Sequence, residues 1–243
     1  MWFRKAIKNI GGWGTIKDKY LYITASSLPV ILGSNDYNNL YDLAREKVGI
    51  IEKPYTSNRY TRNGQFMEPK VRDYINKKYG FNFSPDKADD PIRHYKGNCD
   101  GLDLNLKALL EIKTFMKELK VDYYRPQCEF YMELFDIPVC LLVGYKTNEN
   151  FFDGSTFIDK NTGETRDSLF ESCYNTTFYE DRIVIHRFFR DKEYFAKLKE
   201  KIDIFQELLS ILNNNKDLSK EDFYKIYYGK VRELLWYWKL EQK

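Results

Sequence analysis

The stretch from Asp100 to Lys113 restricts the fold of this chain more than any other. Leucines alternate with polar residues over positions 102–106, which is typical of a strand. A second apolar run follows at positions 109–112, and Asn105 with its neighbours favours a turn between the two. The pattern predicts two antiparallel strands that reverse direction about Asn105 and Leu106.

This register brings three charged side chains together. Asp100 would lie opposite Glu111, with their Cβ atoms roughly 5 Å apart. Lys113 comes two residues after Glu111 and therefore points to the same face. A shift of the register by two residues keeps all three on that face, whereas a shift by one separates them.

Two carboxylates and a lysine are costly to bury without a purpose. A hard divalent cation would satisfy the carboxylates, and Mg²⁺ takes oxygen ligands while keeping several waters. A metal-bound water of lowered pKa is a nucleophile for phosphodiester hydrolysis. Lys113 would then orient that water or stabilise the charge that develops on the phosphate.

An ordinary amphipathic hairpin explains the same stretch without any chemistry. The Glu-x-Lys pattern also occurs at Glu118–Lys120 and at Glu241–Lys243, in polar contexts that are typical of surfaces. Only Glu111–Lys113 follows both an apolar strand and a preceding Asp-Gly pair. From this stretch alone, both interpretations stay open.

Length and composition set broad limits. With 243 residues, the chain is one large domain or one domain with a small appendage. The charged share of 31% and the hydrophobic share of 43% predict a soluble globular protein. No apolar run approaches the roughly 20 residues of a membrane span, and the basic N-terminus lacks a signal-peptide core, so we expect an intracellular protein.

The net charge of +3 means that a nucleic-acid site would have to be a local patch.

The four cysteines are scattered, with no Cys-x-x-Cys pair. This argues against a zinc ribbon and gives little support for an iron–sulfur cluster. Free thiols in a reducing compartment are expected at all four positions. They are Cys99, Cys128, Cys140 and Cys173.

Before the hairpin, the chain reads mainly as helices and loops. Thr24 or Ser26 is expected to cap a short helix that has Pro29 in its first turn and ends at Gly33. A helix is expected over 36–48, loops over 50–59 and 81–91, and a strand over 92–96.

Residues 60–79 show an apolar stripe at helical spacing and predict another helix. Because Pro69 prefers a first turn, the main part of this helix would start near Glu68. Glu68 then has two interpretations. It is an exposed residue favoured by the helix dipole, or it faces inward beside the apolar stripe.

After the hairpin, a helix over 122–134 places Gln127 and Tyr131 on one face. Residues 138–145 predict a buried central strand, and 146–180 a polar excursion that could contain a hairpin. A strand over 183–189 and a long helix over 191–212 follow, and a capping box at 219–222 starts a final helix. The apolar stripes of these two helices indicate core or subunit contacts.

Taken in order, four groups of residues resemble the motifs of the phage-lambda-type exonucleases, also called the YqaJ family of viral recombinases. The resemblance covers roughly residues 20–145, and its second half has the pattern of the PD-(D/E)xK nuclease core. The four groups are Ile23-Thr-Ala-Ser-Ser27, Gly64-x-x-x-Glu68-Pro69, Asn98-Cys-Asp100-Gly101 with Leu110-Glu-Ile-Lys113, and Arg125-Pro-Gln127-x-x-x-Tyr131.

The resemblance implies an α/β fold with a restriction-endonuclease-like core, in which helices flank a mixed central β-sheet and further helices follow at the C-terminus. It implies a single nuclease domain over 1–243, with the core at about 20–190 and a helical part at 191–243. The implied activity is a Mg²⁺-dependent deoxyribonuclease, with Mn²⁺ as an alternative metal, that degrades linear double-stranded DNA from 5′ to 3′ in recombination or end processing. An endonuclease of the same fold, the nuclease part of a helicase complex and an idle DNA-binding protein are the alternatives.

Partners and location follow from the same resemblance. Double-stranded DNA is the implied substrate, with a single-strand annealing protein as a partner and a homo-oligomer, such as a trimer, as the assembly. No membrane is expected to be involved. The implied location is the cytoplasm of a bacterial or viral host cell, or the nucleus if the host is eukaryotic.

The resemblance also assigns roles to residues. Asp100, Glu111 and the Ile112 carbonyl would bind the metal, and Glu68 would complete the shell directly or through water. Lys113 would position the attacking water, and Gln127 would orient Lys113 or that water. The residues implied at the DNA and its 5′-phosphate are Lys19, Ser26, Asn98 and Tyr131.

Two positions depart from the family pattern. Cys99 stands where the signature has proline, which leaves the metal ligands unchanged. Lys19 stands where the family can carry arginine, and a lysine binds phosphate as a point charge instead of a fork. This second departure weakens the expectation that cleavage depends on a 5′-phosphate.

Overall fold

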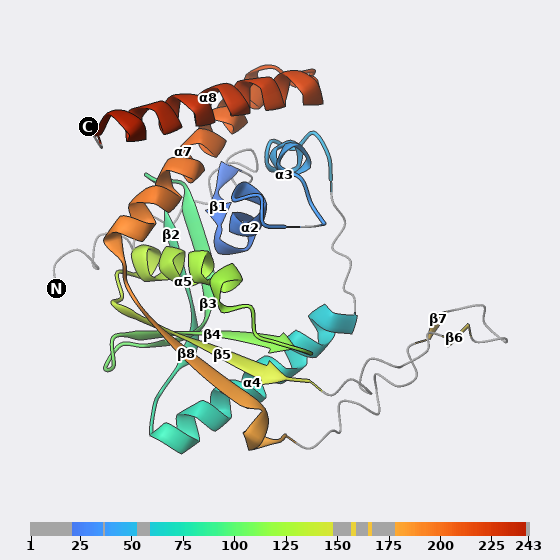
Figure 1. Cartoon of the computed structure of the whole chain (residues 1–243). Helices are drawn as coiled ribbons and strands as arrows, with labels where there is room; N and C mark the ends of the chain where they lie inside the picture. The colour runs from blue at the N-terminus through green and yellow to red at the C-terminus, as the bar shows by residue number, and fades with distance from the viewer. Residues whose placement is uncertain are drawn as a thin grey trace. The chain divides into compact units, whose positions relative to one another are not determined.

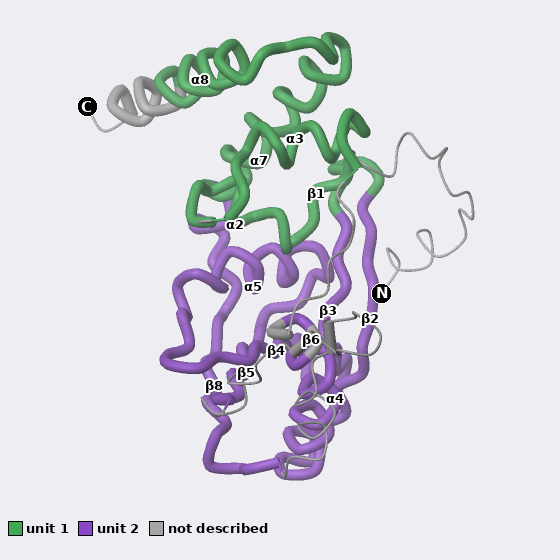
Figure 2. The backbone as a smooth tube through the Cα atoms, turned by 90° about the vertical axis from the view of Figure 1, so that its right-hand side faces the viewer, with its two compact units in different colours: residues 1–53, 91–95, 197–243 green, residues 54–90, 96–196 purple. Residues whose placement is uncertain are grey.

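The computed structural model describes residues 21–35, 37–52, 59–147, 157–158, 165–166 and 178–241 (Figure 1). The chain divides into two compact units (Figure 2). Unit 1 comprises residues 1–53, 91–95 and 197–243, and unit 2 comprises residues 54–90 and 96–196.

A mixed β-sheet forms the centre of unit 2. Its strands run in the order β3-β4-β5-β8, and β2 pairs with β3, while β1, which precedes β3 in the strand order, belongs to unit 1. β3 and β4 are antiparallel, β4 and β5 are parallel, and β5 and β8 are antiparallel. The predicted α/β fold with a mixed central sheet is therefore confirmed. The bounds are β1 Ile23–Thr24, β2 Ser84–Asp90, β3 Tyr95–Asp103, β4 Ala108–Phe115, β5 Val139–Lys146 and β8 Ile183–Phe189.

Two helices cover this sheet. α4 (Arg59–Tyr79) packs its apolar stripe on Leu110 and Ile112 of β4. Side chains alternate along a strand, so Glu111 points to the opposite face, where α5 (Val121–Phe135) lies. α5 also makes the crossover that joins the parallel strands β4 and β5.

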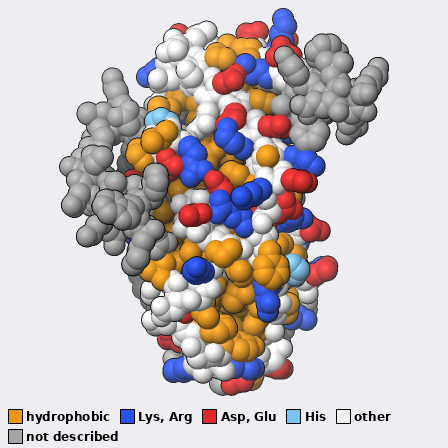
Figure 3. Space-filling view, turned by 90° about the vertical axis from the view of Figure 1, so that its left-hand side faces the viewer, with side chains coloured by type: hydrophobic (Ala, Val, Ile, Leu, Met, Phe, Trp, Pro, Cys, Tyr) orange, Lys and Arg blue, Asp and Glu red, His pale blue; other side chains and the backbone are white. Residues whose placement is uncertain are grey.

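β8 ends the sheet as an edge strand, and most of its side chains are exposed. Val184, Ile185 and Phe189 are among its exposed apolar residues. Figure 3 shows hydrophobic side chains gathered over the lower part of the face that it views, which belongs to unit 2. Between β5 and β8, the described residues include a short hairpin of β6 (Phe157–Ile158) and β7 (Thr165–Arg166), in the region predicted to be an excursion.

Two predictions for unit 2 are wrong. Residues 84–90, expected as part of a loop, form β2, which pairs with β3 although it is polar and mostly exposed. The main helix does not start near Glu68, because α4 runs unbroken from Arg59 with Pro69 inside it. Packing of the stripe that follows Pro69 outweighs the single backbone hydrogen bond that proline removes.

The described part of unit 1 includes the expected capped helix. Thr24, and not Ser26, is the N-cap of a short 3₁₀ turn, and the Ser27 side chain completes its capping box. The turn leads into α2 (Leu28–Ile31), which has Pro29 in its first turn. Gly33 follows with φ of +71°, a left-handed conformation that favours glycine. α3 (Leu40–Lys47) starts later than predicted, because the Asn39 side chain caps it.

The long helices of unit 1 follow the predicted stripes. α7 (Lys192–Asn214) begins in unit 2 and buries Ile202, Phe205 and Leu209 along its unit 1 part. α8 (Lys220–Glu241) starts at the expected capping box and buries Phe223, whose ring lies 5.2 Å from that of Tyr41 on α3. The apolar stripes therefore form the core of this unit.

Two further predictions concern the cysteines and membrane-spanning helices. Cys99, Cys128 and Cys140 are buried free thiols, as predicted, and Cys173 lies outside the described residues. Within the part of the chain that the structure describes, no helix is long and apolar enough to cross a bilayer.

Candidate active site

The hairpin of β3 and β4 has the predicted register. Gly101 pairs with Leu110, and Asp103 pairs with Ala108. Continued by one pair, this register sets Asp100 opposite Glu111. The reversal lies at Asn105–Leu106, as the alternating pattern predicted.

Asp103 holds the turn of this hairpin. Its Oδ1 accepts hydrogen bonds from the backbone N–H groups of Asn105 at 2.9 Å and Leu106 at 3.1 Å. Its Oδ2 accepts a third from Asn82 at 2.8 Å. Burial tends to raise the pKa of the Asp103 carboxyl, but the three hydrogen bonds lower it, and the net shift is downward. The turn is thus fixed by a carboxylate before it and not by the side chain of Asn105.

Glu111 is the buried centre of the site, with 1% of its surface exposed. Its Oε1 lies 2.5 Å from Lys113 Nζ and accepts a hydrogen bond from Gln127 Nε2 at 2.7 Å. Its Oε2 is also buried but has no hydrogen-bond partner among the described residues. A buried carboxylate oxygen without a partner is costly unless a ligand satisfies it.

Asp100 joins the two strands at the site. Its Oδ2 accepts a hydrogen bond from the Ile112 backbone N–H at 2.7 Å. Burial and the nearby charge of Glu111 raise the pKa of Asp100 well above its ordinary value. Burial likewise raises the pKa of Glu111, against the opposing effect of Lys113. Both shifts show mainly that burial disfavours the charged form of these carboxyls.

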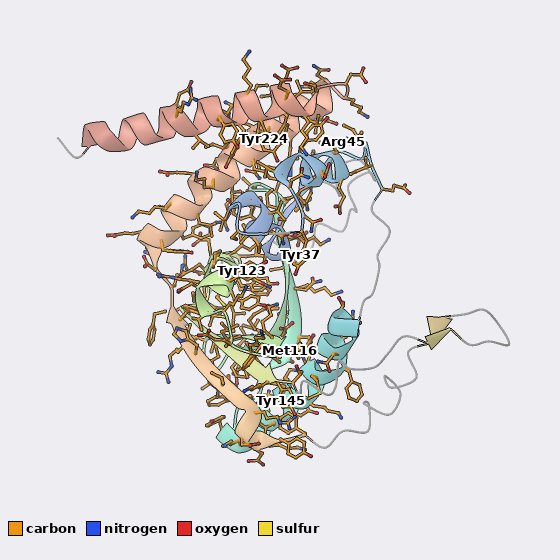
Figure 4. All side chains as sticks on the ribbon, turned by 45° about the vertical axis from the view of Figure 1, so that its right-hand side comes forward. Tyr37, Arg45, Met116, Tyr123, Tyr145 and Tyr224 are labelled. Carbon is orange, nitrogen blue, oxygen red and sulfur yellow. The ribbon has the colours of Figure 1, made fainter. Side chains whose placement is uncertain are left out.

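Lys113 is the cation of the site, with 26% of its side chain exposed. Burial alone would lower its pKa, but the charges of Glu111 and Asp100 and the hydrogen bond with Glu111 raise it. The ammonium also lies 5.4 Å from the centre of the Tyr124 ring, at the start of α5. Figure 4 labels the neighbouring Tyr123 on this helix and Met116 just beyond the end of β4.

Gln127 and Tyr131 share one face of α5, as predicted. The Gln127 amide holds Glu111 and also lies 3.4 Å from the Tyr131 hydroxyl. That hydroxyl donates to the Asn98 backbone carbonyl at 2.8 Å. The Tyr131 ring packs where a Cβ at Gly97 would come within 2.7 Å of it, so this close approach requires glycine. Asn98 itself is exposed.

Glu68 stands in the middle of α4 and not at a helix start. Its side chain is 34% exposed, and its Oε1 accepts a hydrogen bond from Arg72 Nη1 at 3.0 Å. The same Arg72 nitrogen donates to the backbone carbonyl of Asp100 at 2.8 Å. The charge of Glu68 makes a smaller contribution to the raised pKa of both Asp100 and Glu111.

The arrangement fits a divalent cation held mainly by two carboxylates. Asp100 and Glu111 supply hard oxygen ligands, and the orphaned Oε2 of Glu111 is the atom that a cation would satisfy. The described residues contain no group of three His, Cys, Asp or Glu side chains placed to hold a metal by themselves. Glu68 is thus suited to act through water, which Mg²⁺ retains in most sites.

Ser26 belongs to unit 1 and is described there. It is exposed, and its Oγ lies 3.1 Å from Thr24 Oγ1. It lines a hollow of about 440 Å³ together with Asp42, Glu46 and Glu52. Lys19, the second residue implied at the 5′-phosphate, lies outside the described residues.

Solved structures show which fold this is. The chain superposes on an alkaline exonuclease (LHK-Exo) from Laribacter hongkongensis with a TM-score of 0.56 and 16% identity, over 81% of this chain and 91% of the other. It superposes on a phage-related exonuclease from Haemophilus somnus 129PT with a TM-score of 0.59 and 16% identity, over 81% and 96%. The chain has the fold of these exonucleases. The fold implied by the sequence motifs is thereby confirmed.

Neither the protein-family models nor the curated proteins match the chain. At 16% identity, the structural likeness establishes the fold, and the chemistry has to be argued from the site.

Arg72 and Tyr124 were not predicted at the site. The signal for Arg72 was present in the sequence, because Glu68 and Arg72 are four apart on a helix and such pairs of opposite charge meet. Tyr124 could have been found from its place three residues before Gln127, one turn away on the same helix.

Proposed function

We propose that this protein is a metal-dependent deoxyribonuclease that hydrolyses phosphodiester bonds. The observation that carries the proposal is Glu111, a buried carboxylate with one oxygen held by Lys113 and Gln127 and the other without a partner. Asp100 stands across the hairpin and adds a second carboxylate. Such a costly arrangement is retained where it serves chemistry.

Each residue has a role in the proposed reaction. Asp100 and Glu111, with the Ile112 carbonyl, would hold Mg²⁺ or Mn²⁺, and Glu68 would act through water. The bound cation supplies a water of lowered pKa as the nucleophile. Gln127 fixes the Glu111 carboxylate in one orientation and so limits the positions that a ligand can take.

Lys113 is proposed to act as a cationic donor. Its raised pKa keeps the ammonium protonated at neutral pH. The ammonium therefore orients the attacking water or stabilises charge on the phosphate.

The proposed substrate is linear double-stranded DNA, degraded from 5′ to 3′ in recombination or end processing. The shared fold with two structures described as exonucleases supports an exonuclease over an endonuclease. Ser26, Asn98 and Lys19 are proposed at the DNA and its 5′-phosphate. Tyr131 would act there through its hydrogen bond to the Asn98 backbone. A single-strand annealing protein and a homo-oligomer, such as a trimer, are the proposed partners, in the cytoplasm or nucleus of the host cell.

The test is digestion of linear, 5′-phosphorylated duplex DNA beside a closed circular duplex, with Mg²⁺ and with EDTA. Loss of the linear form alone, and only with Mg²⁺, is the expected result. Nicking of the circle would replace the exonuclease with an endonuclease of the same fold. If neither DNA is cleaved with Mg²⁺ or Mn²⁺, the proposal fails in favour of an idle DNA-binding protein.

A further inference from the structure

Arg72 is the charged residue beside the site for which the proposed reaction gives no role. It lies one turn after Glu68 on α4, and only 14% of its side chain is exposed. One nitrogen, Nη1, donates both to Glu68 Oε1 at 3.0 Å and to the Asp100 backbone carbonyl at 2.8 Å. A single guanidinium nitrogen therefore connects two residues that are proposed to serve the metal.

We infer that Arg72 is a positioning residue, which holds Glu68 and Asp100 in the geometry that binds the catalytic metal. This inference rests on the proposed function and deepens it. Arg72 itself touches neither metal nor DNA in this role. It acts by fixing a side chain of α4 and the backbone of β3 at one point.

The connection matters because this hydrogen bond joins α4 to β3 at the site. The Asp100 side chain is fixed from β4 through the Ile112 N–H, whereas its backbone carbonyl is fixed from α4 through Arg72. Glu68 is one-third exposed, and a long exposed side chain samples several rotamers unless a partner holds it. The bond to Arg72 removes that freedom before the metal arrives.

The positive charge of Arg72 and its hydrogen bonds have opposite effects on metal binding. The direction in which metal affinity changes in a variant therefore shows which effect dominates. If Arg72 only added positive charge, it would repel a divalent metal, and its removal would tighten metal binding. If Arg72 positions the ligands, its removal weakens metal binding, because loss of residues that orient metal ligands typically costs about 10- to 100-fold in affinity or activity.

The experiment compares the full-length protein with Arg72→Ala and Arg72→Lys. The dissociation constant of Mn²⁺ is measured by calorimetry without DNA. The Mg²⁺ concentration for half-maximal cleavage is measured separately. For Arg72→Ala, we expect the Mn²⁺ dissociation constant and the half-maximal Mg²⁺ concentration each to rise about tenfold or more. Arg72→Lys keeps the charge and a donor, so it should recover part of the loss. Lys77→Ala removes an exposed lysine from the same helix and is the matched control, with no change in either value expected.

A purely structural role would give a different result. It would lower the melting temperature and the folded fraction but leave the metal dependence of the folded protein unchanged. A double variant tests the route through Glu68. In a Glu68→Gln background, the Arg72→Ala change should have a clearly smaller effect on Mn²⁺ binding than in the wild type.

Suppose that the wild-type protein binds Mn²⁺ and cleaves DNA. If Arg72→Ala then binds Mn²⁺ as tightly as the wild type or more tightly, the inference is wrong and the proposed function stands. If the wild type itself neither binds Mn²⁺ nor cleaves DNA, the proposed function fails, and the inference fails with it. The calorimetry of the wild type separates these two failures.

Discussion

Carboxylates are treated in opposite ways in two parts of this molecule. In unit 2, Glu111 is buried, and its one satisfied oxygen has two side-chain donors. In unit 1, the hollow beside Ser26 is lined by several acidic residues that are exposed or half-buried. The number of acidic residues is similar, but only the first arrangement is costly. Glu111 has a buried oxygen that a ligand could satisfy, whereas the acidic residues of the hollow are solvated.

The hollow of unit 1 is also poorly suited to an anion. Lys47 lines it, but Nζ donates to the backbone carbonyl of Tyr22 at 2.6 Å. Burial lowers the pKa of Lys47, against the opposing effect of Glu46. Phosphate binding through Ser26 would therefore depend on hydroxyl groups in a negatively charged surrounding, which makes it a weak contact.

The largest effect is expected from Glu111→Gln, which tests whether the buried carboxylate is the centre of the chemistry. The change keeps the shape but removes the charge that pairs with Lys113 and is proposed to hold the metal. Cleavage should fall by at least the roughly 10³-fold that loss of one donor to a transition state can cost. Initial rates on linear duplex DNA measure it.

The matched control for this change is Glu46→Gln in the acidic hollow. It removes one carboxylate from unit 1 and should leave the cleavage rate within about twofold, since near-surface charges contribute little. Equal losses in the two variants would erase the distinction between the two regions.

The second largest effect is expected from Gln127→Ala. This change removes the 2.7 Å hydrogen bond to Glu111 Oε1 and leaves Lys113 as the donor that remains. A loss of about 10- to 100-fold in cleavage, with a higher Mg²⁺ requirement, is expected for a residue that orients a metal ligand. Steady-state rates over a range of Mg²⁺ concentrations measure both effects.

Gln206→Ala is the control, because this glutamine also donates one hydrogen bond, to the Arg93 carbonyl of unit 1. Its cleavage rate should not change. If Gln127→Ala behaves like this control, Gln127 is only a structural residue.

The hairpin could be predicted from sequence because two independent signals agree there. Alternation of leucines fixed the faces of the strands, and the short turn fixed the register. The result is the pairing that sets Asp100 opposite Glu111. The motifs of the YqaJ family added the fold, which the structural likeness to known exonucleases confirms.

The sequence failed where tertiary contacts outweigh local preference. The segment Ser84–Asp90 carries no apolar alternation, yet it forms β2 because its backbone pairs with β3. Pro69 indicated a helix start, yet α4 continues through it because its stripe packs on β4. This second error hid the position of Glu68 in the middle of a helix.

A smaller effect on cleavage is expected from Ser26→Ala, which tests the weak phosphate contact of unit 1. One neutral hydrogen bond contributes about 0.5–1.5 kcal/mol, so the preference for 5′-phosphorylated over 5′-hydroxyl ends should fall by no more than about tenfold. The ratio of initial rates on the two substrates measures this preference. Ser34→Ala, which removes a hydroxyl bonded to the Pro29 carbonyl, is the control. Complete loss of the preference would show that the acidic hollow binds phosphate in spite of its charge.

The smallest effect on cleavage is expected from Asp103→Asn, which separates the stability of the hairpin from its chemistry. The change turns one acceptor oxygen into a donor that faces a backbone N–H, so unfolding should become easier by about 1–3 kcal/mol. Cleavage by the folded protein should not change. Asp203→Asn, at an exposed pair with Lys199 on α7 of unit 1, should cost no more than about 0.5 kcal/mol.

The difference in the free energy of unfolding between the wild type and Asp103→Asn depends on pH, and this dependence identifies its cause. The three bonds lower the pKa of Asp103 in the folded state, so its carboxylate stabilises the fold fully above the pKa of the unfolded chain. That stability is lost as the pH falls through the lower, folded pKa. Urea unfolding at neutral and at acidic pH should therefore show the gap between wild type and Asp103→Asn closing on acidification. A gap that stays constant would mean that the substitution disturbs packing, because a packing defect has no proton to lose or gain.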